Sequence, residues 1–178
     1  MAELNLHYVN ELIEVRQEQH GGNQGAPYIV NGHRVGASLN RSCVVMLSAL
    51  LQSFVEEVFF ETSVELLGIE DNAQSVFRKS FSRWGNPSDQ NVRALFNRLG
   101  IGDVLADLSW RGCRRGRVNE NLRQLNELRN QIAHGGQYLR WQNRPYSLSL
   151  AEAVRLRDFA QRFGDYFPAH ARSEAGLE

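Results

Sequence analysis

The stretch from Leu39 to Leu67 constrains the fold more than any other part of the chain, because it is apolar around almost its whole helical circumference. Large aliphatic and aromatic side chains point in every direction when the stretch is wound at about 3.6 residues per turn, and Gly68 ends the run. Such a helix must be covered on all sides. We therefore expect it at the centre of a helical bundle or buried in a dimer.

Helical periodicity dominates the rest of the chain as well, so we expect an all-α, single-domain fold with one small β-hairpin. Asn31-Gly32 between two apolar-rich triplets predicts that hairpin near residues 28–35. We divide residues 1–178 into an N-terminal helix and hairpin (1–37), a helical core (38–167) and a frayed tail (168–178). The other predicted helices, with their caps, are 3–19, 39–67 capped by Ser38, 71–83, 89–99 capped by Ser88, one or two turns at 103–108, a helix capped by Asn119, and a last helix from Ser149 to about Tyr166.

The helix capped by Asn119 carries three polar residues of interest. One of its faces is apolar, and two consecutive glycines, Gly135 and Gly136, stop it directly after His134. Asn130 and His134 are four residues apart and share a face. Arg129 lies five residues before His134, which on an ideal helix is roughly 140° away. One helix does not easily focus Arg129 and His134 on the same atom, whereas fraying at the glycines or a second copy of the helix could bring them together.

The pair Arg129 and His134 resembles the Arg-x4-6-His motif of the HEPN superfamily, the nucleotide-binding domains of higher eukaryotes and prokaryotes. The apolar helix 39–67 and the segment Asn86–Ile101 precede it in the order that resembles the RiboL-PSP-HEPN branch. The resemblance covers the chain from about Leu39 to Tyr166. It implies an HEPN-like helical bundle, often dimeric and often a metal-independent endoribonuclease of a toxin or phage-defence system.

The three polar residues suit RNA cleavage without a metal or other cofactor. RNA carries its own nucleophile, the 2′-hydroxyl, and histidine titrates near neutral pH, so His134 can act as base or acid. Arg129 supplies a permanent charge for the phosphorane, and Asn130 can orient the imidazole or a phosphate. No cluster of carboxylates near the motif would hold a metal. We also consider Glu56, in the polar stripe of the apolar helix, as a residue that orients Arg129 or His134.

Structural roles explain the same residues equally simply. His134 can interact with the last carbonyls of its helix, and Arg129 can pair with a carboxylate such as Glu56 or a neighbour's Glu127. Glu56 can instead face solvent or pair with a buried arginine. The alternatives to a nuclease are therefore a non-catalytic HEPN-like module that binds RNA, a nucleotide or a protein, and a plain dimerisation domain.

Charge is unevenly distributed, although the formal net charge is zero. Residues 78–144 hold twelve arginines and one lysine against five acidic residues, whereas residues 1–77 hold three arginines against ten. This asymmetry indicates an anionic partner, self-association, or charges that balance on a solvated surface. Arg114, Arg115 and Arg117 are candidates for RNA phosphate contacts. Tyr138 and Trp141 can stack on unpaired bases or fold onto the core.

Partners and location follow from the same reading. We expect RNA and a second copy of the chain as partners, with an antitoxin or another defence-system protein as a further one. The first residues do not form a secretory signal, and apolar runs are interrupted by polar residues before they reach spanning length. We therefore expect a cytoplasmic protein without a membrane segment.

Overall fold

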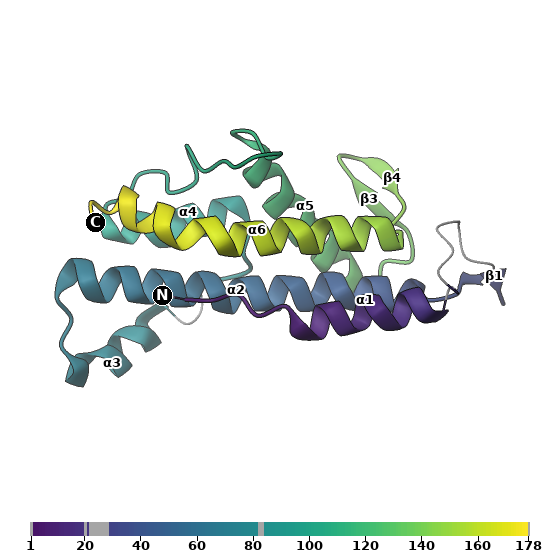
Figure 1. The fold of residues 1–178 in the computed structure, drawn as a ribbon, viewed down its shortest axis with the longest axis horizontal. Coiled ribbons are helices and arrows are strands. Elements are labelled where there is room, and N and C mark those ends of the chain that lie inside the picture. Colours follow the sequence, from purple (N-terminus) through teal and green to yellow (C-terminus); the bar gives the residue numbers. More distant parts are fainter. Residues whose placement is uncertain (1, 20, 22–28, 82–83, 178) are drawn as a thin grey trace.

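The computed structural model describes residues 2–19, 21, 29–81 and 84–177, which form a helical bundle with two small β-hairpins (Figure 1). This confirms the expected all-α class, and β1–β2 confirms the hairpin, although Tyr28 lies outside the described residues. Within the described residues the helices are α1 (His7–Gln19), α2 (Ala37–Leu67), α3 (Asp71–Phe81), α4 (Asp89–Phe96), the 3-10 turn η1 (Asn97–Leu99), α5 (Arg117–Ala133) and α6 (Leu150–Glu174). The antiparallel hairpins are β1 (Ile29–Val30) with β2 (His33–Arg34), and β3 (Leu139–Trp141) with β4 (Arg144–Tyr146).

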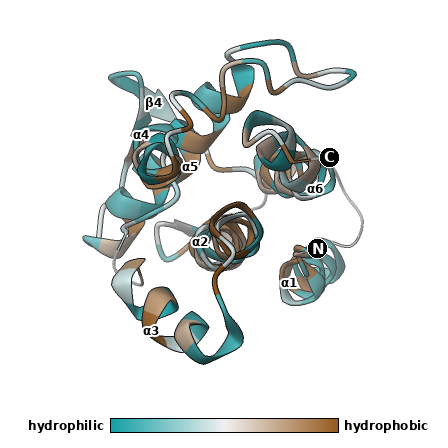
Figure 2. Cartoon of the chain, turned by 90° about the vertical axis from the view of Figure 1, so that its left-hand side faces the viewer, coloured by the Kyte–Doolittle hydropathy of each residue, from teal (hydrophilic) through white to brown (hydrophobic). Residues whose placement is uncertain are grey.

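Helix α2 is the centre of the bundle, and the other helices are arranged around it in the end-on view of Figure 2. It packs mainly against α6, α1 and α5. Phe54 of α2 meets Phe163 of α6 edge-on, with ring centroids 6.2 Å apart, and Phe59 meets Phe96 of α4 at 5.4 Å. One side of the apolar circumference is thus covered within one copy of the chain, whereas Val45 is 38% and Leu67 56% exposed.

Among the described residues, α2 is also the one helix that is long and apolar enough to cross a membrane. Half of its most apolar window is buried inside the bundle, and core helices of soluble proteins pass the same test. The composition of α2 is therefore accounted for by its central position in the bundle.

Two of the predicted helix caps are wrong, and in both cases a glycine begins the helix instead. Gly36 precedes α2 with φ 74°, and Gly116 precedes α5 with φ 79°, each without a side-chain cap. Ser38 and Asn119 already lie inside these helices, because the left-handed glycine turns the chain into the helix two residues before Ser38 and three before Asn119. The cap at Ser88 is confirmed, since its Oγ accepts from the Asn91 N–H.

Helix α6 runs to Glu174, well past the predicted end at Tyr166, so the predicted frayed tail is mostly helix. Pro168 lies inside it, where it forgoes one backbone hydrogen bond. Two features offset that loss. Phe167 and Pro168 are buried, and Arg172 forms a bidentate ion pair with Glu65 of α2.

Two further segments differ from the sequence expectation. Residues 103–108 form turns around Asp103, whose carboxylate accepts from the Leu105 N–H and from Arg93, and they are not helical. The connection after α5 forms the β3–β4 hairpin, with positive φ at Gln142 and Asn143. The short helix predicted for 71–83 is present as α3 as far as Phe81, and residues 82–83 lie outside the described residues.

Candidate functional site

The C-terminal end of α5 is closed by two glycines for two different reasons. His134 is the C-cap residue of α5. Gly135 follows it with φ 74°, a conformation that favours glycine. The Gly135 N–H donates to the Ile132 carbonyl at 3.0 Å, and the Gly136 N–H donates to the Gln131 carbonyl at 2.8 Å. This is the Schellman arrangement. A Cβ on Gly136 would lie 2.8 Å from that Gln131 oxygen, so both positions exclude larger residues.

The chain beyond His134 is held by side chains that the sequence analysis missed. Arg41 of α2 donates Nη1 to the Gly136 carbonyl and Nη2 to the Gln137 carbonyl, both at 2.6 Å. The Gln131 amide accepts from the Arg140 N–H and donates to the Arg140 carbonyl, both at 2.8 Å. The segment from the helix end to the β3–β4 hairpin is therefore fixed from two sides.

Arg129 and Asn130 are brought together. Arg129 Nη1 donates to Asn130 Oδ1 at 3.1 Å, and Asn86 Nδ2, from the loop before α4, donates to the same oxygen at 3.2 Å. Two donors on one oxygen define the orientation of the Asn130 amide and turn its own NH₂ group away from them. Asn91 Nδ2 holds the Asn86 carbonyl at 2.8 Å and so steadies that loop. Asn86, which belongs to the segment 86–101, is a site residue that the sequence analysis did not single out.

His134 is exposed, and no hydrogen bond or ion pair joins its imidazole to another residue of the described part of the chain. Because Arg129 bends toward Asn130, its guanidinium lies toward the face that Asn130 shares with His134. The arrangement offers one permanent cation, one amide donor and one solvent-accessible imidazole along the last turns of a single helix.

Glu56 has a different electrostatic neighbour. Glu57 forms the ion pair with Arg78 at 2.5 Å, which raises the pKa of Arg78, and Glu56 adds to that rise through its charge. Within the described residues, no hydrogen bond connects Glu56 to Arg129 or His134. Its proposed orienting role stays a prediction without a supporting contact.

The three basic-loop arginines lie at the opposite end of α5 from His134. Helix α5 has 17 residues, and at about 1.5 Å per residue it separates its two ends by roughly 25 Å. Arg114, Arg115 and Arg117 are exposed; Arg115 pairs with Asp107, and Arg117 pairs with Glu120 at 2.6 Å. These arginines are therefore not gathered around the imidazole within one copy of the chain.

The β3–β4 hairpin, by contrast, adjoins the helix end. Tyr138 is 88% exposed, the highest value among the exposed large hydrophobic residues of the described part. Arg140 and Arg144 are exposed as well, whereas Trp141 is half-buried. The hairpin and the tyrosine directly before it thus present an aromatic ring and two cations near the C-terminal end of α5.

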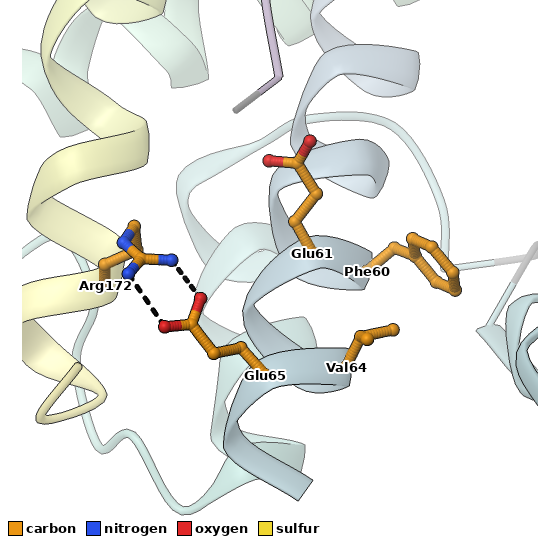
Figure 3. A pocket seen from close by; sticks show the side chains of 5 residues that line it. All are labelled: Phe60, Glu61, Val64, Glu65 and Arg172. Atoms are coloured by element: carbon orange, nitrogen blue, oxygen red, sulfur yellow. Dashed lines mark hydrogen bonds and ion pairs between the residues drawn. The ribbon is translucent and has the colours of Figure 1, made fainter. Parts of the chain in front are cut away.

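A surface hollow lies apart from this arrangement. Figure 3 shows a shallow hollow of about 400 Å³ lined by Phe60, Glu61, Val64, Glu65 and Arg172. It lies near the C-terminal end of α2, whereas Arg41 holds the end of α5 near the N-terminus of α2, so the hollow is separate from the motif. The described residues contain no group of three or more His, Cys, Asp or Glu side chains arranged to hold a metal ion.

Comparison with known protein families gives a match over most of the helical bundle. The model of the family described as RiboL-PSP-HEPN matches residues 68–171, which begin just after α2 and run through α3, α4, α5, the β3–β4 hairpin and most of α6. No curated protein and no solved structure matches the chain significantly. The matched region spans more than half of the sequence and contains the arginine, both asparagines and the histidine described above. The chain belongs to the RiboL-PSP-HEPN family, a branch of the HEPN superfamily.

Proposed function

We propose that the protein is a metal-independent endoribonuclease of the toxin or phage-defence type that acts in the cytoplasm through Arg129, Asn130 and His134. The observation that carries this proposal is the hydrogen bond from Arg129 to Asn130, which turns the guanidinium toward the face that Asn130 shares with an exposed His134. Membership of a superfamily whose domains are often ribonucleases supports it.

The chemistry requires only groups that RNA and these side chains supply. His134 takes the proton from a 2′-hydroxyl, whose oxygen attacks the adjacent phosphorus and forms a 2′,3′-cyclic phosphate. The bond from phosphorus to the 5′-oxygen breaks, and that oxygen receives a proton from a second acid. Arg129 neutralises the charge that grows on the phosphorane, and the NH₂ group of Asn130 donates to a phosphate oxygen.

A homodimer supplies the second acid most simply. One copy of the motif contains one exposed histidine, whereas a two-fold axis beside the end of α5 would place two histidines and two arginines around one phosphate. Sedimentation velocity at micromolar concentration measures this directly. A monomer that cleaves RNA at full rate would contradict the dimeric arrangement.

Substrate contacts are assigned to two surfaces. Tyr138, directly before the hairpin, and the hairpin residues Arg140 and Arg144 lie near the end of α5 and suit the nucleotides next to the scissile bond. Arg114, Arg115 and Arg117 suit phosphates farther along the strand, because roughly 25 Å of α5 lies between them and His134. The proposal includes an antitoxin or defence-system partner, which expression of the protein with its genomic neighbours tests by relief of growth arrest.

The test of this function is cleavage of a labelled RNA in EDTA with identification of the new ends. We expect cleavage without added metal and products that carry a 2′,3′-cyclic phosphate and a 5′-hydroxyl. Activity that EDTA abolishes and magnesium restores would reject the mechanism, and so would products with a 5′-phosphate. Growth arrest on expression that His134→Ala relieves would support the toxin or defence role.

One observation favours the alternative, a non-catalytic module that binds RNA, a nucleotide or a protein. The bond from Asn86 to Asn130 joins α5 to the loop before α4, and the bond from Arg129, within α5, holds the same amide in place, so both also have a purely structural use. The two functions separate experimentally. If the protein is a binding module, the wild type binds RNA without cleaving it. Arg129→Ala should then lower the free energy of unfolding by as much as it weakens the free energy of RNA binding.

A further inference from the structure

Arg16, in the last turn of α1, is the most unusual charged residue in the described part of the chain. It is only 2% exposed, and its Nε and Nη1 atoms have no hydrogen-bond partner within that part. Other buried or half-buried arginines are paired, such as Arg155 with Glu152 and Gln124. A buried guanidinium without a counter-charge is strongly unfavourable, so a compensating group is expected beside it.

The guanidinium lies directly against the N-terminus of α2. A Cβ built on Gly36 would be 2.4 Å from Arg16 Nε and 2.7 Å from its Cζ, so the absence of a side chain at Gly36 makes room for Arg16. Gly36 is the N-cap of α2, and no side chain caps the free N–H groups of the first turn. The positive end of a 31-residue helix and a buried cation therefore meet at one place.

Asn40 provides a third polar group one turn farther along α2. It is buried, its Nδ2 donates to the Leu148 carbonyl at 2.9 Å, and its Oδ1 has no partner within the described residues. Gly36 and Asn40 are four residues apart, so they face the same side of the helix. The N-terminal turn thus combines unpartnered donors on Arg16 with one unpartnered acceptor on Asn40.

We propose that the N-terminus of α2 and Arg16 form a binding site for a phosphate group. Helix N-termini bind phosphate through backbone N–H groups, and an arginine adds a fork of charged donors for two of its oxygens. A protonated phosphate oxygen can also donate to an acceptor such as Asn40 Oδ1. Because Arg16 is buried, the site admits a small phosphate ion or the end of a nucleotide rather than a continuous RNA strand. This site is independent of the proposed nuclease function.

The test measures thermal unfolding of the whole chain with inorganic phosphate, with a nucleoside 5′-monophosphate, and with sodium chloride at equal ionic strength. A ligand that binds only the folded state raises the midpoint as its concentration exceeds Kd. We expect a saturable rise with inorganic phosphate beyond that in chloride. A rise with the nucleotide alone would instead identify the nucleotide as the source of the phosphate group, and the site would stand.

Arg16→Met removes the charge and keeps an unbranched side chain, and Arg162→Met removes an exposed arginine of α6 as the matched control. We expect the phosphate-specific rise in Arg162→Met and its loss in Arg16→Met, which should fold at least as stably in chloride because it buries no unpaired charge. Phosphorus NMR of phosphate with each protein reports binding without unfolding the protein. If Arg16→Met does not fold, Arg16→Lys, which lacks the planar guanidinium, takes its place as the test variant. Wild-type protein that responds equally to phosphate and chloride, or a phosphate response unchanged by both Arg16 substitutions, would overturn the proposal.

Discussion

Arg41→Met tests whether the contact between α2 and the end of α5 fixes the segment after His134. The guanidinium donates to the Gly136 and Gln137 carbonyls, both at 2.6 Å. Hydrogen bonds from a charged donor contribute about 1.5–3 kcal/mol each when they are protected from water. Arg41 is half-buried and its bond to Gln137 is exposed, so we reduce the expected loss for the pair to about 1–2 kcal/mol.

Urea unfolding measures that loss as a lower midpoint at an unchanged slope. Amide exchange adds a local measurement, and we expect the Arg140 N–H, which donates to Gln131, to exchange faster in Arg41→Met. Arg41→Lys keeps the charge but loses the planar fork, so its free energy of unfolding should lie between those of wild type and Arg41→Met. Arg98→Met, at an exposed position, is the control for removal of a cation. If the free energy of unfolding of Arg41→Met lies within about 0.5 kcal/mol of that of wild type, and its hairpin amides stay protected from exchange, Arg41 does not fix this segment.

Three further changes have defined outcomes. Gly136→Ala should cost about 1–3 kcal/mol in urea unfolding, because its Cβ would lie 2.8 Å from a helical carbonyl oxygen, whereas Gly102→Ala has no atom within 4 Å and should be near neutral. A hydrogen bond from its arginine partner on α3 lowers the pKa of Glu57, so the stability from this pair is present above about pH 4.5 and is lost as pH falls through the lower folded pKa. The denaturation midpoint of Glu57→Gln should therefore fall less than that of wild type on acidification, and an identical acid dependence would refute the pairing. Tyr138→Ala should weaken binding of single-stranded RNA about 5- to 150-fold if one base stacks on the ring, while Tyr8→Ala, at an exposed tyrosine of α1, should leave it unchanged; equal affinities would remove the hairpin from the interface.

Local patterns in the sequence were sufficient to predict the helices and several of their ends. Burial of apolar faces defines α2 and α5, and Gly68, Gly100 and Gly135 end their elements with positive φ. The N-terminal caps at Ser38 and Asn119 were wrong because a glycine two or three residues earlier competes for the same role, and propensity alone does not rank the two.

Contacts between distant segments could not be predicted from periodicity. Arg41 reaches Gly136 across 95 residues, and Asn86 reaches Asn130 across 44, so neither pairing leaves a local pattern in the sequence. The end of α6 was wrong for the same reason, since an ion pair between Arg172 and Glu65 stabilises the helix beyond its proline. The motif residues were proposed from the sequence and stay a prediction, whereas the contacts that hold them to other elements required the fold.

The most direct test of the central claim is the rate of RNA cleavage by His134→Ala in EDTA. His134 is exposed at the end of α5, so its replacement should leave the fold intact, as circular dichroism and urea unfolding can verify. His7→Ala, at an exposed histidine of α1, is the matched control. We expect wild-type protein and His7→Ala to cleave equally, and His134→Ala to lose about 100-fold or more of the rate with little change in RNA affinity. A folded His134→Ala that cleaves RNA at the wild-type rate would contradict the account and leave His134 as a structural residue at the helix end.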